Sequence, residues 1–428
     1  MRAITGQGAY ANLALADALD QARLESRDSG LVTDVVAGTC RAMTTLDLVI
    51  EAASGRALKT LQPAVVDLLR LGSFELLFGR APQHAVLSTY VELTRDTVGE
   101  RATGVVNAIL RRVSAKDEAG WLAQLDDGDA HHEMALATWH PSWIVDAYID
   151  VLGVDEAQQA LMANNEPPTT TLVIRPGLAE RDELMAVGAQ PGRWSPYAVT
   201  VSGDPSRLPQ VRHGSVGVQD EGSQLVALAL AKATAPNGDW LDLCAGPGGK
   251  TALLTGLLGG CGLAVDQHEH RAQLVRQAVG VFNQPPSVVV ADATVPAWPA
   301  HQFARVLADV PCSGLGALRR RPDARWRRLP EDIDQLYELQ VAILLAAVDA
   351  AMPGGVVAYA TCSPHRRETV DVVTEVLTRR PGVELMDATT LLPEVPDCAS
   401  PIDGQMVQLW PHRHGTDAMF LAMLQAHA

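Results

Sequence analysis

The sequence predicts an α/β protein in which a doubly wound, mainly parallel sheet of the Rossmann-like kind follows an all-helical domain and a small α+β unit. Three observations lead to this prediction. From about residue 215 onward, short apolar β runs alternate with helical segments of roughly ten to twenty residues. Residues 1 to about 115 show helical spacing with almost no strand signal. Between these regions, two short β runs flank one helical segment.

The N-terminal region is expected to form one all-helical domain over residues 1–130. Its segment LQPAVVDLLRLGSFELLFG places Pro63 near a helix start and then repeats valine and leucine at helical spacing. The segment ATGVVNAILRRVSA continues that pattern and ends in two basic residues, Arg111 and Arg112. The following stretch, residues 116–132, is polar and acidic, which is typical of a linker.

Residues 131–214 are predicted to form a helical linker followed by a small α+β unit. Helical patterning returns between residues 133 and about 165. PPTTTLVIRPG is then a β-rich run closed by proline and glycine, ERDELMAVGA is typical of a helix, and YAVTVSG predicts another short strand.

Residues 215–428 are predicted to form the doubly wound domain. The candidate strands are the short apolar runs DWLDLCAG, GLAVDQ, SVVVADAT, ARVLADVPC and GGVVAYATC. Because helices cover both faces of a parallel sheet, its strands are expected as near-continuous apolar runs of this kind.

Composition excludes several classes of protein. The chain has 428 residues, 47% hydrophobic and 20% charged, as in ordinary globular proteins. Its six cysteines are scattered with no C-x-x-C pair, so neither a disulfide framework nor a metal site is expected. The N-terminal segment lacks the apolar core of a signal peptide, and the most apolar stretch, ALLTGLLGGCGLAV, is too short and glycine-rich to span a bilayer. A cytoplasmic protein with no membrane partner is expected.

One basic segment stands out against a net charge of −16, which argues against a protein that coats nucleic acid indiscriminately. LRRRPDARWRR combines its arginines with Trp326 and a single acid, Asp323. Such a segment can be a solvated helix face, or a strip that binds RNA phosphates and offers a ring for stacking. We predict phosphate binding for Arg319, Arg320, Arg321, Arg325, Arg327 and Arg328.

The glycine-rich segment LDLCAGPGGKT follows the first candidate strand and opens a helix. A phosphate-binding P-loop needs a glycine five residues before Gly249, where Cys244 stands. A dinucleotide-binding loop needs a glycine at position 251, which is threonine. What remains is an acid, Asp242, four residues before a G-x-G, the pattern of loops that bind S-adenosylmethionine. S-adenosyl-L-methionine is therefore the predicted cofactor.

Acidic residues follow three further candidate strands. Asp266 is placed to bond the two ribose hydroxyls of the cofactor, Asp292 is expected at its adenine amino group, and Asp309 ends the third strand. A single acid at such a place is more often a helix N-cap. Because the carboxyl ends of parallel strands meet at one edge of the sheet, the joint occurrence of these acids favours a ligand site there.

Two cysteines, Cys312 in DVPCS and Cys362 in ATCS, follow candidate strands and are expected in the same crevice as the cofactor. The cysteines expected to be small buried hydrophobic residues are Cys40, Cys244, Cys261 and Cys398. A thiolate near a methyl donor points to one reaction in particular. C5 of a pyrimidine is a poor nucleophile until a thiolate adds to C6, and the thiol must be activated by its surroundings.

These motifs resemble a known family. VQDEGSQL, LDLCAGPGGKT, DVPCSGLG, YATCS and HGTDAMFLAML are similar to the ordered motif series of the Sun/Fmu-type RNA cytosine-5 methyltransferases, over roughly residues 215–428. The segments RDSGLVTDVVAGTCR, RLGSFELLFGRAPQHAV and GVVNAILRRV resemble the NusB-like RNA-binding domain. A NusB-like extension on this core characterises the bacterial 16S ribosomal RNA cytosine-5 methyltransferase B branch of the family.

The resemblance implies roles for individual residues. Cys362 matches the nucleophile, Cys312 matches the cysteine that assists release of the methylated base, and Asp309 also contacts the target cytosine. The residues matched to cofactor binding are Cys244, Ala245, Gly246, Pro247, Gly248, Gly249, Lys250, Asp266, Arg271, Asp292 and Asp309. The chain departs from the family in PHRRET, which keeps Glu368 but lacks the usual asparagine, and in LVIRPG, so substrate contacts there stay open.

The expected function is S-adenosylmethionine-dependent methylation of a cytosine of 16S ribosomal RNA at C5. The substrate is either free ribosomal RNA or an assembly intermediate of the small subunit, and the enzyme is expected to be a monomer. A transfer RNA methyltransferase with the same chemistry is the nearest alternative. A DNA cytosine-5 methyltransferase would use the cysteine of its P-C motif as nucleophile, and the second cysteine in ATCS argues against it. A non-catalytic NusB-like RNA-binding or antitermination factor would need neither the cofactor loop nor the thiols.

Overall fold

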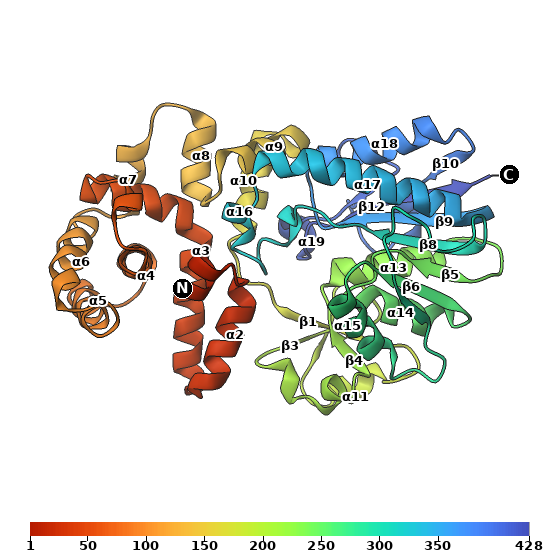
Figure 1. Cartoon of the computed structure of the whole chain (residues 1–428), viewed down its shortest axis with the longest axis horizontal. Coiled ribbons are helices and arrows are strands. Elements are labelled where there is room, and N and C mark those ends of the chain that lie inside the picture. Colours follow the sequence, from red (N-terminus) through yellow and green to blue (C-terminus); the bar gives the residue numbers. More distant parts are fainter. Residues whose placement is uncertain (428) are drawn as a thin grey trace. The chain divides into compact units, whose positions relative to one another are not determined.

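The computed structural model describes residues 1–427, without the side chain of Ser26, and divides the chain into two compact units (Figure 1). The first unit contains Met1–Ile149, Gly153–Glu166 and Leu318–Arg328, and the second contains Asp150–Leu152, Pro167–Ala317 and the chain from Leu329 onward. Most of the predicted helical linker therefore lies in the first unit. The segment Leu318–Arg328 also belongs to that unit, although it interrupts the sheet-containing part of the sequence.

The first unit is all-helical, as the periodicity of the sequence predicts. Its elements are α1 (Arg2–Gln7), α2 (Ala11–Ala22), α3 (Ser26–Ser54), η1 (Leu58–Thr60), α4 (Pro63–Phe78), α5 (Gln83–Thr97), α6 (Glu100–Val113), α7 (Glu118–Leu125), α8 (Ala130–Thr138), α9 (Ser142–Leu152, whose last residues fall in the second unit), α10 (Val154–Ala163) and α16 (Ala324–Arg327). Pro63 occupies the first turn of α4, where its missing N–H and fixed φ suit a helix start.

Helices α3 to α6 bury the apolar stripe that the sequence shows at helical spacing. Ile50, Leu69, Val106 and Leu110 are fully buried among them, in one cluster. Burial of side chains of this size is worth about 1.5–3 kcal/mol each, so packing of the amphipathic faces stabilises these helices more than intrinsic propensity does. None of the helices in the described part of the chain is long and apolar enough to cross a membrane.

The second unit contains a small antiparallel sheet with strand order β2-β3-β1-β4. Its elements are β1 (Thr170–Ile174), α11 (Arg181–Met185), β2 (Gln190–Pro191), β3 (Ala198–Val201), η2 (Pro205–Arg207), α12 (Pro209–Arg212) and β4 (Val216–Val218). The predicted strands in LVIRPG and YAVTVSG are β1 and β3. The run at Val216–Val218, expected to open the large domain, instead pairs with β1, so the small sheet extends past residue 214.

The large sheet has the order β10-β12-β9-β8-β5-β6-β7, with β11 paired to β12. Its strands are β5 (Trp240–Asp242), β6 (Gly262–Asp266), β7 (Ser287–Val290), β8 (Phe303–Asp309), β9 (Ala351–Thr361), β10 (Val383–Met386), β11 (Val407–Gln408) and β12 (Phe420–Ala426). The five predicted runs are β5 to β9, and all four pairings among them are parallel. Strand β12 is antiparallel to both β9 and β10. The prediction of a doubly wound, mainly parallel sheet is confirmed.

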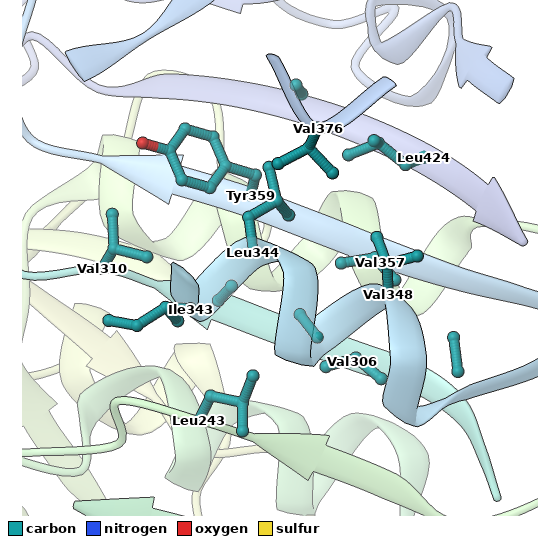
Figure 2. Close-up of a cluster of buried hydrophobic side chains, with 14 of the residues drawn as sticks. Leu243, Val306, Val310, Ile343, Leu344, Val348, Val357, Tyr359, Val376 and Leu424 are labelled. Atoms are coloured by element: carbon teal, nitrogen blue, oxygen red, sulfur yellow. The ribbon is translucent and has the colours of Figure 1, made fainter. Parts of the chain in front are cut away.

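Helices cover both faces of this sheet. The helical elements of this part of the chain are α13 (Glu221–Lys232), α14 (Gly249–Leu258), α15 (Glu269–Val279), η3 (Leu315–Ala317), α17 (Pro330–Ala350), η4 (Arg366–Glu368), α18 (Val370–Arg379), η5 (Ala388–Leu391) and α19 (Pro411–His414). Figure 2 shows one face, where Val357 and Tyr359 of β9 pack with Leu344 of α17 and Val376 of α18. The intervening residue Ala358 packs in the cluster on the opposite face, with side chains of α13 and α14. Burial on both faces explains why these strands are continuous apolar runs.

Candidate active site

The glycine-rich loop lies between β5 and α14, at the carboxyl edge of the parallel strands. Gly248 has φ +105°, and a Cβ there would lie 2.8 Å from the Cβ of Ala278. A Cβ on Gly246 would lie 2.5 Å from Oδ2 of Asp266. Larger residues would therefore strain the loop or fill the space beside it, which is why glycine is required at both positions. The loop therefore packs closely against Asp266 and α15 at the start of α14.

Asp266 and Arg271 brace this loop from β6 and α15. The buried carboxylate of Asp266 accepts hydrogen bonds from the backbone N–H of Gly246 (3.1 Å) and of His268 (2.9 Å). Arg271 forms an ion pair with Asp266 (Nε to Oδ2, 3.3 Å) and donates from Nη2 to the carbonyl of Gly246. Each carboxylate oxygen has two lone pairs, so Asp266 retains acceptor capacity for the ribose hydroxyls predicted for it.

Asp292 follows β7 and is exposed. Its carboxylate accepts hydrogen bonds from the backbone N–H (2.8 Å) and the hydroxyl (2.7 Å) of Thr294, and these bonds lower its pKa. An aspartate that accepts hydrogen bonds from the residue two positions later stabilises a turn of the backbone, and Asp292 does so in the turn after β7. Its predicted contact with the adenine amino group stays a prediction.

Lys250 and Asp309 form an ion pair between the first turn of α14 and the end of β8. Nζ of Lys250 lies 2.7 Å from Oδ2 of Asp309, and both side chains are largely shielded from solvent. Burial is the largest single influence and lowers the pKa of Lys250, but the charge and hydrogen bond of Asp309, with the charges of Cys362 and Asp242, together raise it, so Lys250 carries its positive charge. The charge of Cys362 acts on Lys250 in the same direction, which means that Lys250 favours a Cys362 thiolate.

The register of β8 and β9 brings Cys312 and Cys362 together. Asp309 of β8 lies opposite Ala360 of β9, and the backbone N–H of Gly316 donates to the carbonyl of Cys362 (2.9 Å). The two turns that leave the strands therefore lie side by side, and the two Sγ atoms are 3.3 Å apart. The structure thus brings the two thiols together, and their place in the crevice of the cofactor stays a prediction.

The two thiols differ in electrostatic environment. The hydrogen bond with Cys362, burial, and the negative charges of Cys362 and Glu368 all raise the pKa of Cys312 well above its usual range. Cys312 is therefore a neutral S–H group near neutral pH, whereas the positive charge of Lys250 is placed to stabilise Cys362 as a thiolate.

The remaining cysteines have other environments. Cys40 is fully buried in the helical unit, where burial raises its pKa to about 12, and Cys398 is buried in the second unit. Cys244 is half-buried beside the loop, and Cys261 is exposed, contrary to the expectation that it is a buried residue. Within residues 1–427, no group of three or more His, Cys, Asp or Glu side chains is arranged to hold a metal ion.

The arginine segment requires a correction. Arg325 is fully buried in the helical unit, and its guanidinium donates to the carbonyls of Asn164 (2.9 Å) and Trp139 (3.2 Å) and to Oδ1 of Asn165 (2.6 Å). Burial also lowers its pKa to about 9. The prediction that Arg325 binds RNA phosphate is wrong, because its donors are used inside the protein. Arg319 is buried as well, and RNA binding by it stays a prediction.

The neighbours of Arg325 belong to the same internal brace. Arg327 forms an ion pair with Asp323 (Nε to Oδ2, 2.7 Å) and donates from Nη1 to the carbonyl of Gly8 (2.7 Å), and Trp326 donates to the carbonyl of Cys40 (3.2 Å). Arg320 and Arg328 are half-buried, and Arg321 is exposed. RNA binding by Arg320, Arg321, Arg327 and Arg328 stays a prediction.

The substitution Arg325→Leu is expected to destabilise the helical unit. It leaves buried carbonyl groups without donors, and each such loss costs about 1–3 kcal/mol. We expect the free energy of unfolding to fall by at least about 2 kcal/mol in chemical denaturation, whereas Arg321→Leu, on an exposed neighbour, should change it by less than about 0.5 kcal/mol. Equal stability of the two variants would contradict the internal role of Arg325.

The fold and the site define a Rossmann-like methyltransferase core joined to an all-helical domain. The family model described as 16S rRNA methyltransferase RsmB/F matches residues 227–425, and the model of the NusB family matches residues 2–115. A Mycobacterium tuberculosis protein described as a methyltransferase, Rv1407, is 46% identical over 99% of this chain and 94% of its own length. The ribosomal RNA small subunit methyltransferase B of Vibrio cholerae is 33% identical over 87% of this chain and 86% of its own length. The chain belongs to the RsmB/F family of ribosomal RNA methyltransferases, with an N-terminal NusB domain.

Solved structures agree on the fold. The crystal structure of PH0851 has a TM-score of 0.81 with 21% identity, and covers 96% of this chain and 93% of its own. NSun6 from Pyrococcus horikoshii has a TM-score of 0.58 with 17% identity over 67% of this chain and 98% of its own. These similarities confirm the Rossmann-like architecture.

S-adenosyl-L-methionine is the cofactor of this methyltransferase core, and the residues at the carboxyl edge of the sheet fit it. Gly246 and Gly248 let the loop backbone pack closely against Asp266 and α15, which fixes the loop at the start of α14. Asp266 lies beside this loop with spare acceptor capacity, as a ribose would require. The glycine spacing, the acids at strand ends and the family resemblance predict that this loop binds the cofactor, and the roles of its individual residues stay predictions. The contacts of Glu368, described below, were missed, because an acid in an atypical segment carries no signal of what it contacts.

Proposed function

We propose that this protein methylates a cytosine of 16S ribosomal RNA at C5 through a covalent bond between Cys362 and C6. The observation that carries the proposal is the pair of thiols 3.3 Å apart at the ends of adjacent parallel strands, beside the cofactor loop and the Lys250–Asp309 pair. A methyltransferase that acts on an already nucleophilic oxygen or nitrogen has no use for two thiols in this arrangement. Activation of a pyrimidine carbon explains both of them.

The first half of the reaction uses Cys362 as the nucleophile. Its thiolate, stabilised by the charge of Lys250, forms the S–C6 bond, and the electron pair of the C5=C6 double bond becomes available at C5. Bound S-adenosylmethionine supplies an electrophilic methyl group for that carbon. Asp309, which pairs with Lys250 at the end of β8, would also accept a hydrogen bond from the amino group of the cytosine, as the family resemblance implies.

The second half restores the aromatic base and the free enzyme. A base removes the proton from C5, its electron pair re-forms the C5=C6 double bond, and the C6–S bond breaks with its electrons on the Cys362 sulfur. Cys312 is a neutral thiol 3.3 Å from that sulfur, so it can donate a hydrogen bond to the departing thiolate. This gives the two cysteines different tasks that follow from their different environments.

The target cytosine has to leave its stack, because C5 and C6 are inaccessible inside a base-paired helix. The family description and the name of the Vibrio cholerae relative support a small-subunit ribosomal RNA as substrate, and the NusB domain supports an RNA partner. The enzyme would then act in the cytoplasm during ribosome biogenesis. We propose a monomer.

Bisulfite sequencing of ribosomal and transfer RNA tests this proposal. RNA from a strain lacking the protein should lose one protected cytosine in 16S ribosomal RNA, and expression of the wild-type protein should restore it. Expression of the Cys362→Ala variant should not restore it. Loss of protection in transfer RNA instead would overturn the substrate, and unchanged protection in every RNA would overturn the chemistry.

The substitution Asp266→Ala is expected to weaken binding of S-adenosylmethionine about tenfold or more. An unpaired buried hydroxyl costs about 1–3 kcal/mol, and the loop would also lose the acceptor for the N–H of Gly246. Calorimetric titration checks the affinity, and circular dichroism checks that the fold survives. Glu269→Ala, at an exposed acid paired with Arg276, is the control and should leave the affinity unchanged. Wild-type affinity of Asp266→Ala would mean that the ribose site lies elsewhere.

A further inference from the structure

Glu368 is a fully buried carboxylate directly behind the two cysteine turns. It accepts hydrogen bonds from the backbone N–H of Ser313 (2.8 Å) and from the hydroxyls of Ser313 and Ser363 (2.6 Å for Ser363). Nε2 of Gln340, from α17, is a further donor at 3.0 Å. These donors are all neutral groups, so hydrogen bonds rather than an ion pair hold the carboxylate. They come from three separate segments of the chain.

The donors are significant because of their positions in the sequence. Ser313 directly follows Cys312, and Ser363 directly follows Cys362. The two serine hydroxyls are 3.2 Å apart, next to the two sulfur atoms at 3.3 Å. One carboxylate therefore connects the turn that carries one thiol to the turn that carries the other.

The backbone of Glu368 is fixed as well. Its carbonyl accepts a hydrogen bond from the hydroxyl of Tyr359 (2.7 Å), which comes from the buried face of β9 shown in Figure 2. Two of the side-chain contacts of Glu368 are with Ser313 and one is with Ser363. The turn that carries Cys312 thus depends on Glu368 more than the turn that carries Cys362.

We propose that Glu368 is a positioning residue that holds Cys312 in register with Cys362, so that Cys312 can assist the release of the methylated base. The inference rests on the proposed function, because it assigns Cys312 to that release step. Glu368 does not touch the reacting atoms. It acts through Ser313 and Ser363, and its loss should affect the second half of the reaction more than the first.

The test measures the covalent protein–RNA species directly. Glu368→Ala and Glu368→Gln are incubated with 16S ribosomal RNA and S-adenosylmethionine, and adducts are resolved on a denaturing gel beside wild type, Cys312→Ala and Cys362→Ala. We expect turnover of Glu368→Ala to fall about tenfold or more, since the buried N–H of Ser313 loses its acceptor. The adduct should accumulate, as in Cys312→Ala. Glu368→Gln keeps an acceptor for that N–H and should recover a substantial part of the turnover.

A matched control separates positioning from general destabilisation. Glu221 is another buried carboxylate of the second unit, and it accepts hydrogen bonds from the backbone N–H groups of Arg193 (3.2 Å), Trp194 and Ser195 (2.7 Å). Glu221→Ala should also lower the thermal stability, but its adduct fraction at saturating RNA should stay at the wild-type level. Affinity for S-adenosylmethionine should be unchanged in both Glu368 variants.

The outcomes are distinguishable. Accumulated adduct in Glu368→Ala with rescue by Glu368→Gln supports the positioning role. Loss of turnover without adduct in the Glu368 variants, while Cys312→Ala does form the adduct, overturns that role and leaves the proposed function standing. Absence of adduct in Cys312→Ala itself overturns the proposed function. If Glu368→Ala fails to fold, Ser313→Ala decides in its place, because it removes the hydroxyl that Glu368 holds next to Cys312; an adduct fraction equal to wild type in that variant would contradict the proposal.

Discussion

The substitution Cys362→Ala is expected to abolish methylation and to leave no covalent protein–RNA species, because the other thiol of the site, Cys312, is held as a neutral S–H group. Cys312→Ala is expected to differ. It should still attack the base and methylate it, but release should stall, so a slowly migrating adduct should appear on a denaturing gel in the presence of S-adenosylmethionine. The environments of the two thiols predict this division, since Cys312 is held neutral and Cys362 is close to the charge of Lys250.

The control for this pair is Cys261→Ala, which removes an exposed thiol of the same unit and should leave methylation unchanged. Adducts from Cys362→Ala and none from Cys312→Ala would exchange the roles and favour the mechanism of the DNA enzymes. Full activity in both variants would contradict covalent catalysis by these cysteines.

The substitution Asp309→Asn is expected to lower methylation about a hundredfold. Breaking a buried ion pair by removing one partner costs about 3–5 kcal/mol, and about 1.4 kcal/mol corresponds to a tenfold change. The side chains of Lys250 and Asp309 are 11% and 28% exposed, which places the effect toward the lower end of that range. Without Asp309, the ammonium group beside Cys362 loses its partner and its fixed position. Single-turnover kinetics with saturating RNA measure the loss.

The matched control is Asp349→Asn, which breaks an ion pair of the same kind on the surface. Arg380 and Asp349 are 2.8 Å apart, but their side chains are 39% and 45% exposed. Exposed pairs of this type contribute about 0–1 kcal/mol, so methylation by this variant should stay within a few-fold of wild type. A similar small effect of Asp309→Asn would mean that the Lys250–Asp309 pair takes no part in the reaction.

The parallel half of the large sheet could be predicted from the sequence because its strands are buried on both faces. Each of the five runs is short, apolar and followed by a turn, and each became one of β5 to β9. Strands β10 and β12 were not predicted. Strand β12 lies between β9 and β10 and is antiparallel to both. The residues of a short apolar strand do not indicate which other strand it will pair with. The assignment of Val216–Val218 to the small sheet depends on pairing with β1 for the same reason.

The arginine segment shows the limit of reading charge from sequence. Six arginines close to a tryptophan suggest a surface that binds phosphate, since charged side chains are seldom fully buried without partners. The acceptors that allow Arg325 to be buried are the carbonyl groups of Trp139 and Asn164 and the amide oxygen of Asn165, more than 150 residues earlier in the chain. Sequence proximity to the Cys312 motif therefore gave no information about where this segment packs.

The sequence by itself determined the fold class, because the strands that are buried on both faces are a local property of the chain. Glycine spacing and strand-end side chains, which are local as well, predicted the candidate cofactor loop and the two candidate catalytic thiols. The tertiary structure alone decided the relation between distant residues. The register of β8 against β9 sets the two sulfur atoms 3.3 Å apart, and packing brings Glu368 behind both turns and Lys250 onto Asp309. Contacts such as these depend on how strands pair and helices pack, and those arrangements follow from the burial of the whole chain rather than from any single motif.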